Sequence, residues 1–305
     1  MKALRIERKM ARFAAARVAG SVAPGAGATY GPLRLDDVDP PDLPSPEWVH
    51  VRPRLAGICG SDLSTVDGTA SRYFEPIVSF PFTPGHEVVA DTEDGGRVVL
   101  EPVLGCVARG IDPPCPACAR GDLGGCERLA FGHLAAGLQT GYCCDTGGGW
   151  SEEFVAHPSQ LHEVPDELDD RAAVMIEPTA CAVHAALRHP IREGDTVVVL
   201  GAGTLGLLTI AALRHLTPAG VIITSARYPH QMRLARELGA EDDDGVTLPD
   251  RVAEGGVDRA GGRFDHHGGL VAHVVGHGVE LAGVGDHRRA PAATGVAAVA
   301  RLQPG

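Results

Sequence analysis

The chain has 305 residues, enough for two domains of ordinary size, and its 44% of hydrophobic residues is sufficient for packed cores. The 27 basic and 39 acidic residues give a net charge of −12, which disfavours binding to nucleic acid or to an anionic membrane surface. No apolar run approaches the roughly 20 residues of a membrane span, and the first twenty residues contain no uninterrupted apolar stretch of the signal-peptide kind. We therefore expect a cytoplasmic protein.

The first half of the chain has the pattern of a β-rich domain. Residues 48–52 alternate as a half-buried strand does. Two apolar runs, 88–90 and 97–100, flank Asp94-Gly95-Gly96, which predicts a hairpin. Five of the eight cysteines fall in one stretch of this half, residues 59–126, which in a reducing compartment indicates metal sites more than disulfides.

After residue 168 the pattern changes to alternating helices and strands. Asp169 and Asp170 can cap a helix, and Pro178 is expected to separate it from a second helix ending near Arg188. Residues 196–200 form the continuous apolar run typical of a parallel strand covered on both faces. The sequence therefore predicts two domains, residues 1–168 and 169–305, with 246–305 doubtful.

Two short motifs in the first domain carry zinc-type ligands. Cys59 lies in Gly-Ile-Cys-Gly-Ser-Asp, and His86 and Glu87 follow a glycine. A catalytic zinc takes three ligands from the protein and leaves one position open. Cys59 and His86 are on loops next to predicted strands, so folding can bring them to one ion. For each residue alone, the alternative is a cysteine packed in the core or a solvated histidine.

These motifs and Glu177-Pro178 resemble the catalytic-zinc motifs of the zinc-dependent medium-chain dehydrogenases, in particular the polyol, sugar and threonine dehydrogenase branch. The resemblance runs from about residue 30 to about residue 243. It implies a GroES-like catalytic domain followed by a Rossmann-type, doubly wound parallel sheet. It also implies that Cys59, His86 and Glu177 bind zinc, and that Glu87 binds it or lies just behind it. Glu177 stands where classical alcohol dehydrogenases have a cysteine, which favours sugars and polyols as substrates.

The resemblance further implies the reaction. A zinc ion lowers the pKa of an alcohol hydroxyl, and hydride passes to a nicotinamide cofactor. Ser61 matches the hydroxyl that takes the substrate proton, and Asp62 matches a residue that orients a zinc ligand. Many relatives have a histidine three residues after this serine, but this chain has Ser64. The resemblance also implies a homodimer or a homotetramer.

A second group of cysteines resembles the structural-zinc lobe of the same family. Cys115, Cys118 and Cys126 have its spacing, but Cys106 stands nine positions before Cys115, so the first gap departs from the pattern. Asp112, at the usual spacing, is the alternative fourth ligand. A CxxC pair alone is also compatible with redox chemistry. The remaining cysteines, Cys143, Cys144 and Cys181, are interpreted as structural, with Cys181 in the core.

The cofactor loop follows the apolar run at 196–200. The G-x-G-x-x-G motif comprises Gly201, Gly203 and Gly206 with Thr204 and Leu205, and opens a helix, which is the context that such a motif requires. The next strand is predicted at 221–224. The family's ribose-binding acid position falls on Ala226, flanked by Ser225 and Arg227. Because arginine pairs with a 2′-phosphate, NADP is favoured over NAD.

The last part of the chain fits the fold poorly. Residues 251–305 contain 12 Gly and 5 His, a single aromatic residue, Phe264, and one strand candidate at 271–275. A doubly wound fold needs further apolar parallel strands and crossover helices. We therefore expect residues from about 246 onward not to build the second half of the cofactor domain, as after a frame error or truncation. A divergent but genuine ending is the alternative.

The motifs favour a zinc-dependent oxidoreductase that acts on a small alcohol, with no nucleic-acid or membrane partner. Three alternatives remain at this point. A zinc-free quinone or enone reductase of the same superfamily is opposed by Cys59, His86 and Glu177. A zinc-ribbon module that binds nucleic acid is disfavoured by the net charge of −12. A non-catalytic or truncated relative is the third.

Overall fold

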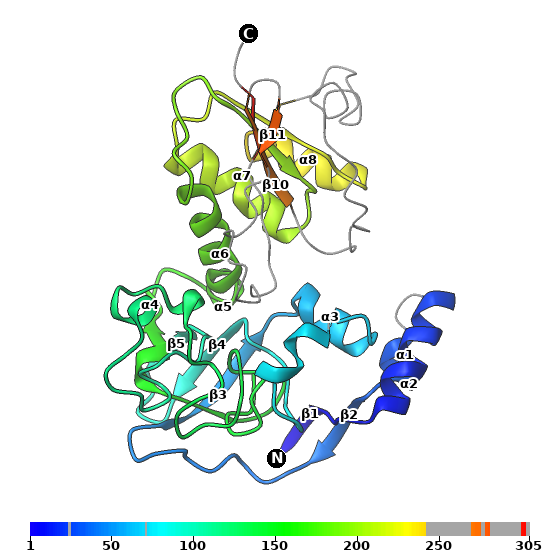
Figure 1. Cartoon of the computed structure of the whole chain (residues 1–305), viewed down its shortest axis with the longest axis vertical. Helices are drawn as coiled ribbons and strands as arrows, with labels where there is room; N and C mark the ends of the chain where they lie inside the picture. Colours follow the sequence, from blue (N-terminus) through cyan, green and yellow to red (C-terminus); the bar gives the residue numbers. More distant parts are fainter. Residues whose placement is uncertain (24–25, 71, 242–269, 276–277, 281–299, 303–305) are drawn as a thin grey trace. The chain divides into compact units, whose positions relative to one another are not determined.

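The computed structural model describes residues 1–23, 26–70, 72–241, 270–275, 278–280 and 300–302 (Figure 1). The chain divides into two compact units, Met1–Glu177 and Pro178–Gly305. In the described part of the chain, no helix is both long and apolar enough to cross a membrane.

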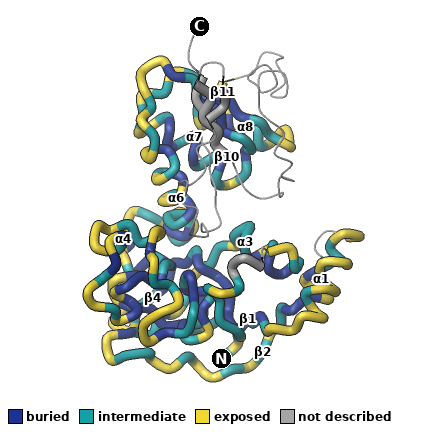
Figure 2. Tube along the Cα trace, in the orientation of Figure 1, coloured by how far each residue is buried: buried dark blue, intermediate teal, exposed yellow. Residues whose placement is uncertain are grey.

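The first unit is built on a five-stranded antiparallel sheet in the order β6–β3–β4–β5–β7. These strands are β3 (Val49–Ala56), β4 (Val88–Thr92), β5 (Arg97–Leu100), β6 (Phe154–Ala156) and β7 (Leu161–Glu163). Val88 and Val89 are both buried but belong to different core clusters, because successive side chains of a strand point to opposite faces. Buried residues accordingly gather around β4 in Figure 2. The strand expected at 48–52 and the hairpin of residues 88–100 are confirmed.

Two further strands, β1 (Lys2–Ile6) and β2 (Leu33–Asp37), pair antiparallel. Between them the chain forms α1 (Met10–Val22) and α2 (Gly27–Tyr30), which pack on each other and on the end of α3 (Gly60–Val66). Glycine is required at this contact. A Cβ atom on Gly31 would lie 2.7 Å from the carbonyl oxygen of Val66.

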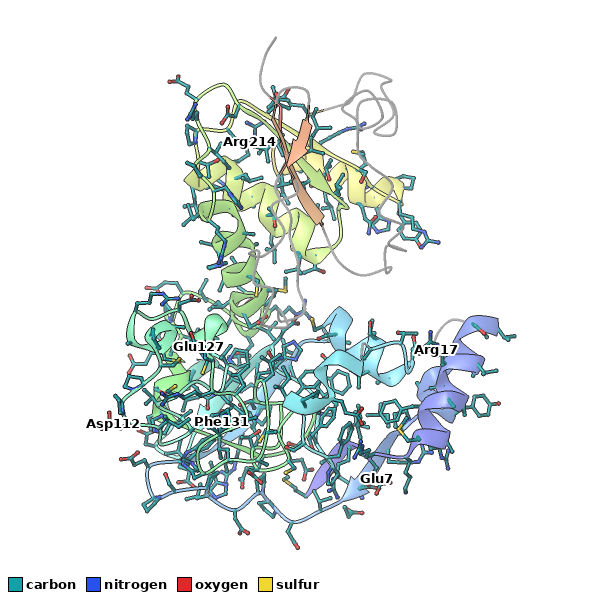
Figure 3. The ribbon with its side chains drawn as sticks, viewed as in Figure 1. Glu7, Arg17, Asp112, Glu127, Phe131 and Arg214 are labelled. Atoms are coloured by element: carbon teal, nitrogen blue, oxygen red, sulfur yellow. The ribbon has the colours of Figure 1, made fainter. Side chains whose placement is uncertain are left out.

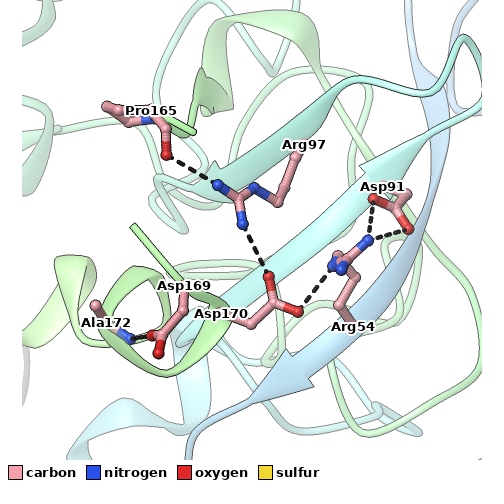
Figure 4. A network of polar contacts seen from close by, with 7 residues as sticks. All are labelled: Arg54, Asp91, Arg97, Pro165, Asp169, Asp170 and Ala172. Atoms are coloured by element: carbon pink, nitrogen blue, oxygen red, sulfur yellow. Dashed lines mark hydrogen bonds and ion pairs between the residues drawn. The ribbon is translucent and has the colours of Figure 1, made fainter. Parts of the chain in front are cut away.

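Short helical turns complete the first unit: η1 (Arg72–Ile77), α4 (Pro116–Ala119), η2 (Leu123–Gly125), η3 (Pro158–Gln160) and α5 (Asp170–Ala173). The Asp169 side chain caps α5 as expected, accepting from the Ala172 amide at 2.8 Å. Asp170 accepts from Arg54 at 2.9 Å and from Arg97 at 3.3 Å (Figure 4). Because these arginines lie on β3 and β5, α5 is held on the sheet, and the first unit extends to Glu177.

Helix α6 (Ile176–Leu187) corrects one expectation from the sequence. Pro178 does not separate the two helices, because it is the third residue of α6. The break lies at Val174 and Met175 instead. A proline fits here because amide groups of the first helical turn have no partner within the helix.

The second unit contains the strand–helix–strand crossover predicted from the sequence. Strand β8 (Thr196–Leu200) leads into α7 (Thr204–Leu216) and then to β9 (Val221–Thr224), which pairs parallel with β8. Helix α8 (Pro229–Glu237) follows. Val197, Val199 and Ile222 are completely buried with Ile210 and Leu213 of α7. The expected dinucleotide-binding crossover is therefore present.

The strand candidate at 271–275 is confirmed as β10 (Leu270–Val275). It pairs antiparallel with β8, as does β12 (Ala300–Leu302), while β11 (Gly278–Glu280) pairs with β10. The described ranges contain no second parallel crossover. The expectation for residues 246–269, 276–277, 281–299 and 303–305 lies outside the described residues.

Candidate metal centres and cofactor loop

The first candidate centre is built on the start of helix α3. Cys59 is the residue before the helix, in an extended conformation. Its backbone N–H donates to Asp62 Oδ2 at 3.0 Å, and its side chain accepts from the Asp62 backbone, so the two residues form a reciprocal cap. Asp62 is 1% exposed. The cap holds the thiol at the helix N-terminus, where the aligned N–H groups favour negative charge.

Two glycines allow His86 and Glu87 to lie next to Cys59, because neighbouring atoms come very close to the backbone at Gly85 and at Gly57. Gly85 has φ +98°, and a Cβ on it would lie 2.8 Å from the Trp150 backbone nitrogen. A Cβ on Gly57 would lie 2.9 Å from Glu87 Cβ. Glycine is therefore needed at both positions. One potential ligand atom each of Cys59, His86 and Glu87 falls within 4.8 Å of the other two.

Burial makes the charged forms of these groups unfavourable. It lowers the pKa of His86 to about 4 and raises the pKa of Cys59 to about 11. Burial also raises the pKa of Asp62 to about 7, and raises that of Glu87. The imidazole is thus neutral and ready to bind a cation at neutral pH, whereas the thiol must lose a proton to do so.

The unpaired polar atoms around the cluster fit a zinc ion. His86 Nδ1 and Asp62 Oδ1 are buried without a hydrogen-bond partner and lie 3.6 Å apart. Ser61 Oγ is also buried and unpaired among the described residues. Unpaired buried polar atoms are costly, and sulfur, nitrogen and oxygen donors together match zinc. A zinc ion would compensate the buried charge of a thiolate and a carboxylate.

Glu177 is not part of this cluster. It lies in the first turn of α6 and is the last residue of the first unit. Its role as a zinc ligand stays a prediction.

The second candidate centre is a cluster of four thiols. Cys106, Cys115, Cys118 and Cys126 have sulfur atoms within 4.8 Å of one another. Cys115 is the N-cap of α4, and its N–H donates to Cys106 Sγ at 3.3 Å. The long loop therefore brings Cys106 back to the other three cysteines. Asp112 is exposed and is not in the cluster (Figure 3). Four sulfur donors in a closed group are the set of a structural zinc site.

Arg109, in the inserted loop, was not singled out from the sequence. Its side chain is completely buried, and it donates to the carbonyl oxygens of Leu104, Phe131, Leu134, Ala135 and Gly137. Burial lowers its pKa, whereas Cys143, Cys126, Asp145 and Cys106 oppose that change. The buried guanidinium of Arg109 thus holds the inserted loop in place, next to the cysteine thiols. An arginine in a loop gives no sequence signal for this role.

The other cysteines divide between core and surface. Cys143 is buried in a core cluster, as interpreted, and Cys144 is exposed. Cys181 is exposed, so its expected place in the core is wrong. The buried residues of α6 are Pro178, Ala182 and Ala186. Cys181 precedes Ala182 by one position and therefore lies about 100° away around the helix.

The cofactor loop joins β8 to α7. Gly201 has φ +100°, Gly203 is the N-cap of α7, and a Cβ on Gly206 would lie 1.8 Å from the Gly201 carbonyl oxygen. Thr204 and Leu205 form the first turn of the helix. Backbone N–H groups at such a terminus are suited to a pyrophosphate.

The end of β9 lies next to this loop. Ser225 Oγ accepts from the Gly201 N–H at 3.1 Å. Arg227 is exposed, and its guanidinium lies 5.6 Å from the centre of the Tyr228 ring. Ala226, at the family's acid position, has no carboxylate. The segment after β9 therefore has a hydroxyl at Ser225 and a positive charge at Arg227, and no carboxylate at position 226.

Comparison with known proteins places these sites in a family context. Residues 45–166 match the alcohol dehydrogenase GroES-like domain. The chain is 29% identical to a sorbitol dehydrogenase of Halalkalibacterium halodurans over 226 residues, which are 70% of this chain and 60% of that protein. The chain thus spans about three fifths of the length of this curated relative.

Solved structures give the same context. An Escherichia coli alcohol dehydrogenase in complex with NADH has a TM-score of 0.59 at 25% identity, over 84% of this chain and 66% of that one. A zinc-binding dehydrogenase of Sinorhizobium meliloti bound to NADP has a TM-score of 0.57 at 26% identity, over 78% of this chain and 60% of that one.

Proposed function

Because residues 45–166 belong to the alcohol dehydrogenase GroES-like domain family and the neighbours of the chain are zinc-type medium-chain alcohol and polyol dehydrogenases, we propose that this protein transfers hydride from an alcohol to a nicotinamide cofactor. The observation that carries the proposal is the cluster of Cys59, His86 and Glu87, with the unpaired Ser61 hydroxyl beside it. The Gly201–Gly206 loop supports the cofactor half of the reaction.

Each residue of the first centre has a distinct task in this mechanism. Cys59 and His86 would hold the zinc, with Glu87 bound to it or just behind it. A bound zinc ion would act as a Lewis acid and polarise the alcohol hydroxyl. Ser61 accepts the hydrogen bond of that hydroxyl, and it would take the substrate proton as it passes its own hydroxyl proton on to a further acceptor. Asp62, 3.6 Å from His86 Nδ1, fixes the orientation of the imidazole.

We infer that the substrate is a sugar, a polyol or another secondary alcohol, and that Glu177 is a further zinc ligand. The sorbitol dehydrogenase relative supports this substrate class. NADP is the proposed cofactor, since Ala226 stands where an NAD-specific site has an acid and the neighbouring Arg227 can pair with a 2′-phosphate. The relatives include complexes with NADH and with NADP. The four-cysteine cluster would hold a second, structural zinc.

We also infer the cellular compartment and the oligomeric state of the protein. Free thiols in both clusters suit a reducing compartment, so we place the protein in the cytoplasm. We expect a homodimer or a homotetramer, which light scattering on a sizing column measures directly.

The test is a panel of polyols, sugars and simple alcohols assayed for NADPH and NADH formation. Cys59→Ser and His86→Ala should abolish turnover and keep NADP binding, because the cofactor loop belongs to the other unit. Cys144→Ser, which changes an exposed thiol outside both clusters, is the matched control. Full activity in Cys59→Ser would rule out this mechanism. Zinc and NADP binding without turnover of any alcohol would favour the non-catalytic relative.

A further inference from the structure

Helix α1 has an apolar outward side that the described residues leave exposed. Its inward side packs on the end of α3: Ala16 is completely buried, and a Cβ on Gly68 would lie 2.5 Å from the Phe13 carbonyl oxygen. Most of the helix is exposed (Figure 2), and six of its nine exposed residues are apolar, namely Met10, Ala11, Ala14, Ala15, Val18 and Val22. A helix that is apolar on all sides is normally buried. The outward side of α1 therefore has the composition of a covered surface.

Four of these residues form a seam along the helix. Ala11, Ala15, Val18 and Val22 are separated by four, three and four positions. Because each residue turns a helix by about 100°, this spacing puts all four on one side, away from Ala16. The same spacing places apolar residues along the contact between two paired helices. Val18 is 67% and Val22 is 83% exposed, so the seam is open to a second helix.

The seam is complementary to itself in one orientation. If two copies of α1 run antiparallel and cross between residues 16 and 17, Ala11 meets the partner's Val22 and Ala15 meets the partner's Val18. Each larger side chain then opposes a small one, which allows close packing. A parallel pair in the same register would put valine against valine and leave gaps between the alanines. The seam therefore fits an antiparallel copy of itself.

The charges of α1 favour the same arrangement. Arg12 is in the first turn, so in an antiparallel pair it would lie beside the last turn of the partner helix. The last turn of α1 has no basic side chain of its own, and a cation near a helix C-terminus is stabilising. Arg17 is about 100° from Val18 around the helix, so its charge lies outside the seam.

The surrounding charges disfavour other occupants of this side. Binding to an anionic lipid surface or to nucleic acid needs several available cations. Three basic residues next to α1 already form ion pairs within the first unit: Lys2 with Asp37, Arg8 with Glu75, and Lys9 with Glu7. Helix α1 itself adds only two arginines.

We propose that α1 is a self-association surface, on which the α1 helix of a second copy of this chain packs antiparallel about a two-fold axis. A contact of this symmetry uses the same residues on both copies. The inference goes beyond the proposed dehydrogenase function and does not depend on it.

The molar mass, measured by light scattering over a range of protein concentrations, tests the contact. Val18→Glu puts a carboxylate into the seam, so the molar mass of the assembly should fall about twofold, because an unpaired charge opposes burial. Leu216→Glu, at a leucine that ends α7 and is 49% exposed, is the control and should assemble as the wild type does. Circular dichroism should show that both variants are folded, because both side chains are exposed within one chain.

Cross-linking tests the antiparallel arrangement. Ala15→Cys and Val18→Cys are prepared as separate proteins, and each protein and an equilibrated mixture of the two are treated with a mild oxidant. The mixture should form a disulfide between position 15 of one copy and position 18 of the other. Peptide mass spectrometry distinguishes this product from disulfides of the native cysteines, such as exposed Cys144. Neither protein alone should link to itself at its new cysteine.

Several results would overturn the proposal. The contact is wrong if the wild type is monomeric at every concentration, or if Val18→Glu has the molar mass of the wild type. Disulfides between identical positions would contradict the antiparallel arrangement. Val18-dependent binding to vesicles of anionic phospholipid, without a change in molar mass, would make this side a membrane surface instead. Alcohol oxidation is measured separately, so failure of the proposed function leaves these outcomes unaffected.

Discussion

Substituting Gly206 by alanine should damage the cofactor loop through one contact. The added Cβ would lie 1.8 Å from the Gly201 carbonyl oxygen. An ordinary contact needs about 3.3 Å, so the helix and the loop must separate by about 1.5 Å. Overpacking of this kind costs about 1–3 kcal/mol, and each kcal/mol lowers Tm by about 2–4 °C in a domain of ordinary size.

Gly203→Ala is the matched control in the same loop. Gly203 has φ −77°, and a Cβ on it would have no neighbour within 4 Å. This variant should keep the wild-type Tm and weaken only NADP binding, because the new methyl group faces the expected pyrophosphate. Thermal melting and calorimetric titration with NADP separate the two effects. The reasoning fails if Gly206→Ala melts as wild type, or if Gly203→Ala is destabilised equally.

The remaining predictions concern charge and metal. Folded protein should contain two zinc ions per chain by elemental analysis, and finding one or none would contradict the two-centre assignment. Arg109→Met should destabilise the four-cysteine lobe by roughly 2–4 kcal/mol, because buried carbonyl oxygens lose their donor; Arg120→Met, at an exposed arginine, should not. Zinc affinity of the first centre should rise about tenfold per pH unit between about pH 6 and 8. Cys59, with its pKa raised to about 11, must release a proton over this range, whereas His86, with a pKa of about 4, is already neutral; a flat profile would refute this. Arg227→Ala should weaken NADP binding by roughly 1–3 kcal/mol and leave NAD binding unchanged.

Local patterns in the sequence were sufficient for the regular elements around both sites. Strand β8 was predicted at residues 196–200 and β9 at 221–224, and both have these bounds. A continuous apolar run and an adjacent glycine motif are properties of neighbouring residues, so they can be recognised without the fold. The candidate ligands were also visible, because Cys59 and His86 lie in motifs that resemble those of zinc dehydrogenases, and Cys115, Cys118 and Cys126 have the spacing of a zinc lobe.

Contacts between distant segments were decided only by the tertiary structure. The sequence left Cys106 and Asp112 as alternatives, and the path of the inserted loop around buried Arg109 puts Cys106 in the cluster. Cys181 is exposed because the packing of α6 selects one helical face. Such groups have ordinary neighbours in sequence, and their chemistry arises from partners that only folding brings within a few ångströms.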